Sequence, residues 1–306
     1  MTETAPPYVG RFAPSPTGPL HFGSLVAALG SYCAARAVGG RWHLRIDDLD
    51  TPRLVPGAVE QILRQLEAFG FDWDGSIYFQ SDHGSRYEAA LEGLRRCGAA
   101  YTCSCTRKEI TAHAERGVLG PIYPGTCRDG MIEPEREPAW RLQLPAGSLQ
   151  VHDLVHGDYR LHAALELGDP MLRRRDGVWG YHLATTIDDA ALGVTDVVRG
   201  SDLLPATLIQ SALQTALGLP SSRWAHLPLA RTRAGEKLSK QTGAEALDSD
   251  RPLPALLEAW RLLGQAEPPD APASIAEFHA WARAHWSLAR APADGDPFAD
   301  GLPHIA

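Results

Sequence analysis

The stretch PSPTGPLHFGS, residues 14–24, constrains the fold most strongly, because it places a rigid loop between a strand and a helix. Residues 8–12, YVGRF, precede it and have the composition of a short strand. From Leu20 onward apolar residues recur every three or four positions, which predicts a helix that starts at the preceding Gly-Pro pair. A strand, a tight loop and a helix N-terminus in this order can bind an anion such as a polyphosphate, because backbone N–H groups and the helix dipole point into the loop. The same pattern also fits an ordinary turn with a surface histidine, His21.

Strand and helix patterns alternate along much of the chain, which predicts an α/β fold with a largely parallel sheet. With 306 residues and 44% hydrophobic composition, the chain is long enough for about two domains. The expected helices are residues 56–70, 81–99 (capped by Ser81 or Asp82), 205–218, 254–264 and 275–286. The expected strands are residues 42–46, 223–230 and segments within 178–204.

The charge and the hydropathy of the chain constrain its partners and its location less strongly. The formal net charge of −8 neither supports nor excludes RNA binding, because a local basic face remains possible on a nearly neutral main body. No apolar run reaches about eighteen residues, so we expect no contact with a membrane. The N-terminus lacks the basic and apolar segments of a secretion signal, so we expect a cytoplasmic protein, and we expect it to be a monomer.

Cysteines and glycines cluster where the strand and helix rhythm breaks, after residue 100. Cys103, Cys105 and Cys127 lie in this segment, whereas the other two cysteines fall within helix patterns. Three cysteines in a Gly- and Pro-rich insertion suggest a structural zinc, which needs a fourth ligand. Chemistry alone ranks His113 first, because imidazole is a common zinc ligand and tyrosine a rare one. The alternative is a set of unligated thiols.

Charged residues follow two of the expected strands. Asp47, Asp48 and Asp50 come after the strand 42–46, at the kind of strand end where open α/β sheets bind ligands, so they could hold Mg2+ or an amino group. A helix cap or a solvated turn would account for at least one of them. Arg199 follows a later apolar segment, and with Arg11 it could bind a carboxylated ligand, because guanidinium and carboxylate pair in a two-pronged fork.

Lysine is rare in this chain. Of the 29 Lys and Arg residues only Lys108, Lys237 and Lys240 are lysines, and two of them stand in EKLSKQ. An ammonium group is a compact, mobile charge, so the pair suggests a phosphate clamp, with chance clustering as the alternative.

Together these motifs resemble the class I aminoacyl-tRNA synthetases. PSPTGPLHFGS is similar to their first nucleotide-binding signature, HIGH, and KLSKQ to the second, KMSKS, in the expected order and about two hundred residues apart. RFAPSPTG, RIDDLD and VVRGSDLL resemble the glutamate branch in particular. The resemblance covers residues 8 to about 243, and it implies a Rossmann-type parallel sheet with a zinc-bearing insertion and a short helical C-terminal region.

The resemblance also implies a division of the chain and a reduced size. The implied parts are a first catalytic half (1–100), an insertion with the zinc site that binds the acceptor (101–175), a second catalytic half with the KLSKQ loop (176–244) and a C-terminal helical region (245–306). Only 65 residues follow Gln241, too few for the anticodon-binding region of a full glutamate enzyme. The match is therefore to a shortened paralogue, a ligase that activates glutamate without tRNA and transfers it to queuosine at the wobble position of tRNA(Asp).

The site residues follow from the same resemblance. His21 and Lys240 would be catalytic, and ATP would be bound by His21, Gly23, Ser24, Lys237 and Lys240. Glutamate would be bound by Arg11, Ser15, Asp47, Tyr181 and Arg199. The zinc ligands would be Cys103, Cys105, Tyr123 and Cys127, which overrules the chemical preference for His113. Departures from the family pattern are Asp47 in place of Glu, Ser24 in place of the final His, and the mild changes Leu238 and Gln241.

The implied substrates are L-glutamate, ATP with Mg2+ and the anticodon loop of tRNA(Asp), and the implied metal is one structural Zn2+. Other readings of the same motifs are an adenylating ligase that acts on a small molecule, a truncated ordinary glutamyl-tRNA synthetase, and a non-catalytic RNA-binding paralogue.

Overall fold

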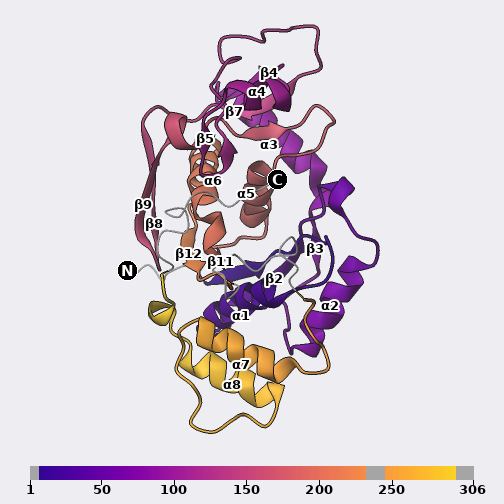
Figure 1. Cartoon of the computed structure of the whole chain (residues 1–306), viewed down its shortest axis with the longest axis vertical. Coiled ribbons are helices and arrows are strands. Elements are labelled where there is room, and N and C mark those ends of the chain that lie inside the picture. Colours follow the sequence, from indigo (N-terminus) through magenta and orange to yellow (C-terminus); the bar gives the residue numbers. More distant parts are fainter. Residues whose placement is uncertain (1–6, 232–244, 294–306) are drawn as a thin grey trace.

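The computed structural model describes residues 7–231 and 245–293, and its centre is a parallel β-sheet, as predicted. In spatial order the parallel strands are β3 (Tyr78–Phe79), β2 (Arg41–Ile46), β1 (Val9–Phe12), β11 (Asp196–Gly200) and β12 (Arg223–Leu227) (Figure 1). The two halves of the sheet meet where the Thr195 N–H donates to the Val9 carbonyl over 2.9 Å. Residues almost two hundred positions apart in the sequence are therefore neighbours at the middle of the sheet.

Helices surround this sheet along its length. They are α1 (Phe22–Arg36), α2 (Ala58–Ala68), α3 (Gly84–Arg96), α5 (Tyr181–Ala191), α6 (Leu204–Leu217), α7 (Pro252–Leu262) and α8 (Ile275–His285). Short 3-10 turns cover Thr51–Arg53, Gln80–His83, Ser201–Leu203 and Leu288–Arg290, and a π-helical turn covers Ala163–Leu167. No helix in the described part of the chain is long and apolar enough to cross a membrane.

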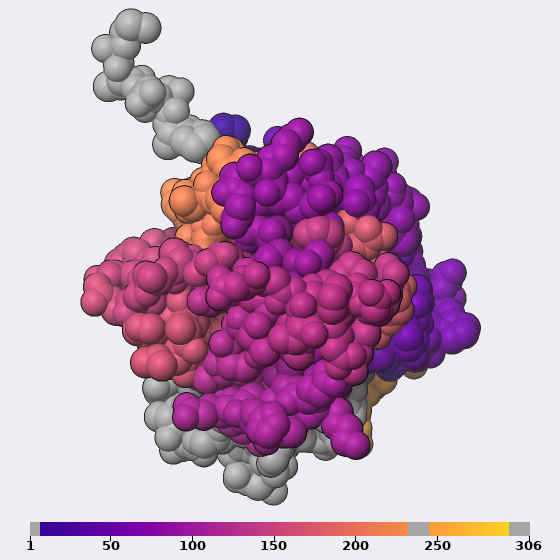
Figure 2. Space-filling model, turned by 90° about the horizontal axis from the view of Figure 1, so that it is seen from above, coloured from indigo at the N-terminus to yellow at the C-terminus, as the bar shows by residue number. Residues whose placement is uncertain are grey.

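The segment after residue 100 forms a separate lobe at one end of the molecule, opposite α7 and α8 (Figure 1). Its elements are β4 (Ala100–Cys103), α4 (Arg107–His113), β5 (Arg116–Gly117), β6 (Gly120–Pro121), β7 (Ala139–Leu142), β8 (Ser148–Asp153), β9 (Gly157–His162) and β10 (Met171–Arg173). β4, β7 and β10 form an antiparallel sheet, whereas the β8–β9 hairpin reaches back and pairs with β12. Seen from the lobe end, this lobe fills the middle of the face and the hairpin projects to the left (Figure 2).

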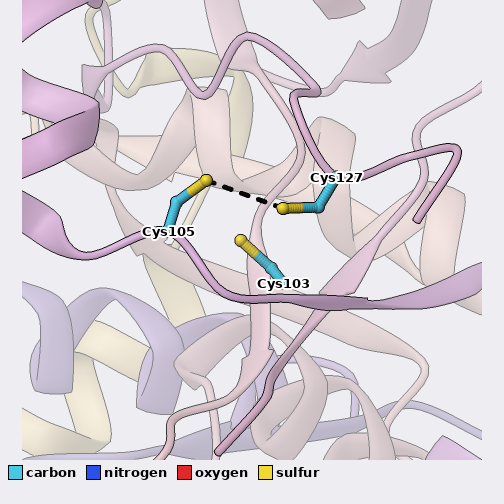
Figure 3. Close-up of side chains that lie close together, drawn as sticks. All are labelled: Cys103, Cys105 and Cys127. Carbon is cyan, nitrogen blue, oxygen red and sulfur yellow. Dashed lines mark hydrogen bonds between the residues drawn. The ribbon is translucent and has the colours of Figure 1, made fainter. Parts of the chain in front are cut away.

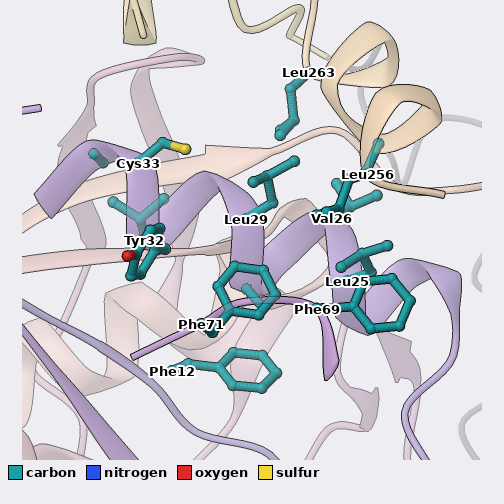
Figure 4. Close-up of a cluster of buried hydrophobic side chains, with 14 of the residues drawn as sticks. Phe12, Leu25, Val26, Leu29, Tyr32, Cys33, Phe69, Phe71, Leu256 and Leu263 are labelled. Atoms are coloured by element: carbon teal, nitrogen blue, oxygen red, sulfur yellow. The ribbon is translucent and has the colours of Figure 1, made fainter. Parts of the chain in front are cut away.

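The main hydrophobic core lies between the sheet and the C-terminal helices. α1 is buried on both sides: Phe12 and Phe71 pack below it, and Leu256 and Leu263 reach it from the region of α7 (Figure 4). Burial of this kind stabilises a fold by roughly 1.5–3 kcal/mol for each large apolar side chain. Residues of α7 and α8 therefore share one hydrophobic core with the parallel sheet.

The segment 178–204 differs in part from its prediction, because residues 181–191 form the helix α5 and only β11 is a strand. Threonine favours strands when isolated. Here, however, the hydroxyl of Thr185 donates to the Tyr181 carbonyl (2.9 Å) and that of Thr186 to the His182 carbonyl (2.8 Å), one helical turn back. Leu183 packs in the core formed with α3 and α6. Tertiary packing thus overrides the local β propensity.

Two helix starts also differ from the prediction. α1 begins at Phe22 with His21 as its N-cap, whose Nδ1 accepts the Ser24 N–H over 3.4 Å, so the Gly-Pro pair precedes the helix. Gly18 adopts φ +129°, which only glycine tolerates easily, and it turns the loop before the helix. α3 begins at Gly84 because Ser81 lies in a 3-10 turn and its hydroxyl donates to Asp48 over 2.6 Å instead of capping a helix.

Candidate active site and metal site

The carboxyl ends of the parallel strands open into a cavity of about 390 Å³. Ser15, Asp47 and Tyr181 line the end of this cavity at the sheet, from the loops after β1 and β2 and from the first turn of α5. Tyr123 and Arg141 line its other end, in the lobe. The cavity therefore joins the strand ends, where ligands bind in open α/β sheets, to the lobe.

A buried row of alternating charges lies behind this cavity. Arg11 Nε is 3.0 Å from Asp189 Oδ1, Arg45 Nη1 is 2.7 Å from the same oxygen, and Arg45 Nε is 2.6 Å from Asp47 Oδ1. None of these side chains is more than 9% exposed. β1, β2 and α5 each contribute, so the row exists only in the assembled sheet.

The row perturbs the titration of its carboxyls. Burial raises the pKa of Asp189, but the guanidiniums of Arg11 and Arg45 outweigh it, and the net pKa is below its usual value. Burial raises the pKa of Asp47 above its usual value even though Arg45 opposes the shift. Asp47 Oδ1 is engaged by Arg45, whereas Oδ2 makes only a longer contact of 3.3 Å to Arg45 Nη2. A substrate ammonium group could therefore pair with Oδ2.

Among the residues that the structure describes, Arg199 differs from Arg11 in having no carboxylate in an ion pair with it. It is 6% exposed, its Nε donates to His226 Nε2 over 3.1 Å, and its Nη2 donates to Thr207 Oγ1 over 2.7 Å. No ion pair to Arg199 occurs among residues 7–231 and 245–293. Burial lowers the pKa of its guanidinium. A buried cation whose hydrogen-bond partners are neutral is an attractive site for an anion, since charge is costly to bury unless it is paired.

Tyr181 and Ser15 are the exposed members of the predicted glutamate set. The ring of Tyr181 is 42% exposed in the cavity, while protein around its hydroxyl raises its pKa. The charges of Arg199, Asp47 and Arg11 all act on that hydroxyl, so these predicted residues share one region. Ser15 lines the same cavity from the loop after β1. Arg11 and Arg199 lie behind the lining, because they are almost fully buried.

The predicted nucleotide site begins at the N-terminus of α1. His21 caps the helix, and Gly23 and Ser24 lie in its first turn. The chain returns to this point after the lysine motif, because His21 pairs with Ala246 in an antiparallel bridge. Lys237, Lys240 and the rest of the predicted second signature, with Leu238 and Gln241, lie outside the described residues.

The thiols of Cys103, Cys105 and Cys127 converge in the lobe (Figure 3). Their sulfur atoms lie within 4.8 Å of one another and all three residues are buried. Burial raises the pKa of Cys127, but hydrogen bonds, from the Ile132 backbone first and then from Tyr123, lower it to about 6. Thiolates at this separation are suited to bind a tetrahedral zinc ion.

Two hydroxyl groups lie close to these thiols: that of Tyr123, which contacts two of them, and that of Ser104, whose Oγ is 3.7 Å from Cys127 Sγ. The Tyr123 hydroxyl oxygen is 3.3 Å from Cys103 Sγ and 3.6 Å from Cys105 Sγ. His113 ends α4 with an exposed side chain and is not a member of the cluster. The fold therefore places a phenol, and not the His113 imidazole, beside the sulfur atoms.

The other acids after β2 have structural partners. Asp48 accepts both the N–H and the hydroxyl of Ser81, over 2.8 and 2.6 Å. Asp50 pairs with Arg53 over 2.5 Å. These two carboxylates therefore stabilise the chain after β2, which agrees with the structural alternative given above for part of the acidic cluster.

Sequence reasoning missed Arg45, Asp189 and His226. Each is a titratable residue within an expected apolar element, and such residues are rarely buried unless they are paired. That rule could have marked all three as members of a buried polar network, but the sequence does not say which partners meet.

Comparisons with known proteins agree with this geometry. A family model described as tRNA synthetases class I (E and Q), catalytic domain, matches residues 8–269. The glutamyl-Q tRNA(Asp) synthetase of Chromobacterium violaceum is 52% identical over 286 residues, which cover 94% of this chain and 96% of that protein. The protein of the same name from Dechloromonas aromatica is 50% identical, with 94% and 96% covered. The crystal structure of a glutamate-tRNA synthetase from Elizabethkingia anophelis matches with a TM-score of 0.80 and 25% identity over 94% of this chain and 67% of that chain.

Proposed function

The chain belongs to the class I tRNA synthetases of the glutamate and glutamine branch, and from this premise we propose that it activates glutamate with ATP and transfers it to queuosine in tRNA(Asp). The observation that carries the proposal is the near full-length similarity to proteins of that activity by name, at 46–52% identity. The shared length supports it as well, because the chain spans 96% of its first relatives but only 67% of an ordinary glutamate enzyme.

Glutamate would bind between the buried charges and Tyr181. Arg199 has no carboxylate partner among the described residues and would pair with one carboxylate of the substrate. Asp47 would accept the substrate ammonium group through its Oδ2, and Ser15 and Tyr181 would line the opening. Arg11 already pairs with Asp189, so its main role would be to fix the position of the buried row of charges.

ATP would bind at the α1 N-terminus. The helix dipole and the backbone N–H groups at the start of the helix favour phosphate there, and the imidazole of His21 stands at that end. Lys237 and Lys240, which are outside the described residues, would add positive charge, and Mg2+ supplies further neutralisation of the phosphates when bound.

In the first step an oxygen of the glutamate α-carboxylate attacks the α-phosphorus of ATP. The new C–O–P bond forms as the bond from the α-phosphorus to the bridging oxygen breaks, and pyrophosphate leaves. His21 and Lys240 would stabilise the negative charge that develops on the phosphate oxygens, as positioning and charge neutralisation do in other phosphoryl transfers. In the second step a hydroxyl of the modified base attacks the acyl carbon, and AMP leaves with the electron pair.

The lobe would hold the acceptor RNA. We assign residues 101–175 to it, 1–100 and 176–244 to the catalytic domain, and 245–306 to the helical region. Cys103, Cys105 and Cys127 with Tyr123 would hold one zinc ion that fixes the lobe. An anticodon loop suits this enzyme because its unstacked bases can enter a cavity, and the ring of queuosine with its two hydroxyls imitates a ribose end.

The test uses labelled glutamate, ATP and tRNA from cells that can and cannot make queuosine. We expect label only on queuosine-containing tRNA(Asp), and glutamate-dependent pyrophosphate exchange without any RNA. His21→Ala or Lys240→Ala should reduce that exchange by about 100-fold, the usual scale for loss of a charge-stabilising donor. Label on the 3′ end of tRNA(Glu) would instead indicate a truncated ordinary synthetase. Exchange with no transfer to any tRNA would indicate an adenylating ligase.

A further inference from the structure

A buried Asp–His pair stands directly behind Arg199. His226 in β12 is 0% exposed, and its Nδ1 is 2.6 Å from Oδ2 of Asp153, which is the last residue of β8. The other oxygen of Asp153 accepts the backbone N–H groups of Val155 and His156, each over 3.0 Å. Asp153 is therefore fixed by its own turn before it meets the imidazole.

These contacts determine the tautomer of His226. Asp153 remains ionised, because hydrogen bonds led by that of His226 outweigh burial and lower its pKa. Its carboxylate can only accept, so His226 Nδ1 must carry the proton. Nε2 then offers a lone pair, and it accepts the Nε–H of Arg199 over 3.1 Å. The opposite tautomer would place two N–H groups against each other.

The same contacts leave one end of Arg199 for a ligand. Its Nε is taken by His226, and its Nη2 donates to Thr207 (2.7 Å) and to the Leu203 carbonyl (3.3 Å). Among the described residues we find no hydrogen bond from Nη1. A guanidinium held at its Nε and Nη2 has no rotational freedom left, so Nη1 points in one direction.

We propose that His226 and Asp153 are positioning residues for the amino-acid substrate: they lock Arg199 so that its Nη1 meets a substrate carboxylate. This inference rests on the proposed function, since it takes Arg199 to bind glutamate. It adds that the β8–β9 hairpin, which lies in the segment 101–175, contributes to amino-acid binding through Asp153.

The test compares Michaelis constants in pyrophosphate exchange. Asp153→Asn keeps the size of the side chain, but its amide can donate to Nδ1 and favour the wrong tautomer. We expect this variant and His226→Leu to raise KM for glutamate about 10-fold or more, the scale for a hydrogen bond to a charged group, with KM for ATP within about twofold. His226→Gln supplies an acceptor oxygen and should recover most of the loss.

A matched control is Gln214→Met in α6, which removes the buried hydrogen bond from Gln214 to Ser222 (3.0 Å) without touching Arg199. It should lower the melting temperature and leave KM for glutamate unchanged. Two results would overturn the inference. One is a KM for glutamate in Asp153→Asn that stays within about twofold of wild type, and the other is a KM for ATP that rises together with the KM for glutamate. If His226→Leu does not fold, Asp153→Asn and His226→Gln decide.

Calorimetry with glutamate alone separates the two claims. Wild-type protein that neither binds glutamate nor exchanges pyrophosphate refutes the proposed function, and this inference with it. If wild-type protein binds glutamate and exchanges pyrophosphate, and the Asp153 and His226 variants bind glutamate with unchanged affinity, only the positioning role is refuted.

Discussion

Asp189 holds two buried guanidiniums, and its replacement by Asn should reveal how much the row of charges contributes to stability. The change keeps the shape and the acceptor oxygen but removes the charge. Arg45 keeps Asp47 as an ion-pair partner, so only Arg11 loses its partner. Removal of one partner from a buried pair costs about 3–5 kcal/mol, and because the Asn oxygen still accepts, we expect the lower end, about 3 kcal/mol at pH 7.

Urea unfolding measures this loss. With a slope of about 1–3 kcal/mol/M, the midpoint should fall by about 1 M or more. Asp196→Asn is the matched control, because the Arg223 side chain that pairs with Asp196 is 57% exposed. Such an exposed partner limits the expected cost to within about 1 kcal/mol.

The loss should also depend on pH in a defined direction. The pKa of Asp189 is lowered in the folded chain, so its stabilisation is complete above the unfolded value of about 3.9 and is lost as pH falls toward the folded value. The gap between wild type and Asp189→Asn should therefore narrow below about pH 4, by up to about 1.4 kcal/mol per pH unit. A gap that stays constant in acid, or a midpoint shift no larger than that of Asp196→Asn, would refute the argument.

Two further predictions concern the metal and the substrate amine. Metal analysis should find about one zinc per chain. The zinc should be lost in Cys105→Ser, reduced in Tyr123→Phe and retained in His113→Ala. Loss of zinc in His113→Ala alone would reverse the ligand assignment. Asp47→Glu should keep glutamate-dependent exchange, because its carboxylate still reaches Arg45. Asp47→Ala should raise KM for glutamate about 10-fold or more, and it leaves the buried guanidinium of Arg45 with one partner fewer. Equal KM values for glutamate in wild type and both variants would show that Asp47 is not part of the site.

The periodic parts of the fold could be predicted from the sequence. α1, α2, α6 and the strands β1, β2 and β12 lie close to where apolar spacing placed them, because their apolar residues are buried in the two main cores. α5 could not be predicted in this way. Its threonines satisfy their hydroxyls on the preceding turn, and its apolar residues meet α3 and α6, which the local sequence does not reveal.

In the candidate site, too, the sequence indicates the chemistry of the residues but not their arrangement in space. The convergence of Cys103, Cys105 and Cys127 follows from residue type and spacing and is confirmed. The fold also places the Tyr123 hydroxyl beside two of these sulfur atoms, whereas chemistry alone ranked His113 first as a fourth ligand. The network behind Arg199 depends on β8, β11, β12 and α6 meeting at one point, and only the assembled structure reveals that.

The row from Arg11 to Asp47 also has a consequence for synthesis on the ribosome. Asp189 is separated from Arg11 by 178 positions and from Arg45 by 144. At roughly 5–20 residues per second, about 7–30 s pass between the emergence of Arg45 and that of Asp189. During this interval Arg45 can pair with Asp47, but Arg11 has not yet met Asp189, its carboxylate partner in the described residues. Burial of Arg11 in the first half of the sheet is therefore unfavourable, and we expect this half of the nascent chain to stay accessible to chaperones and proteases until α5 arrives.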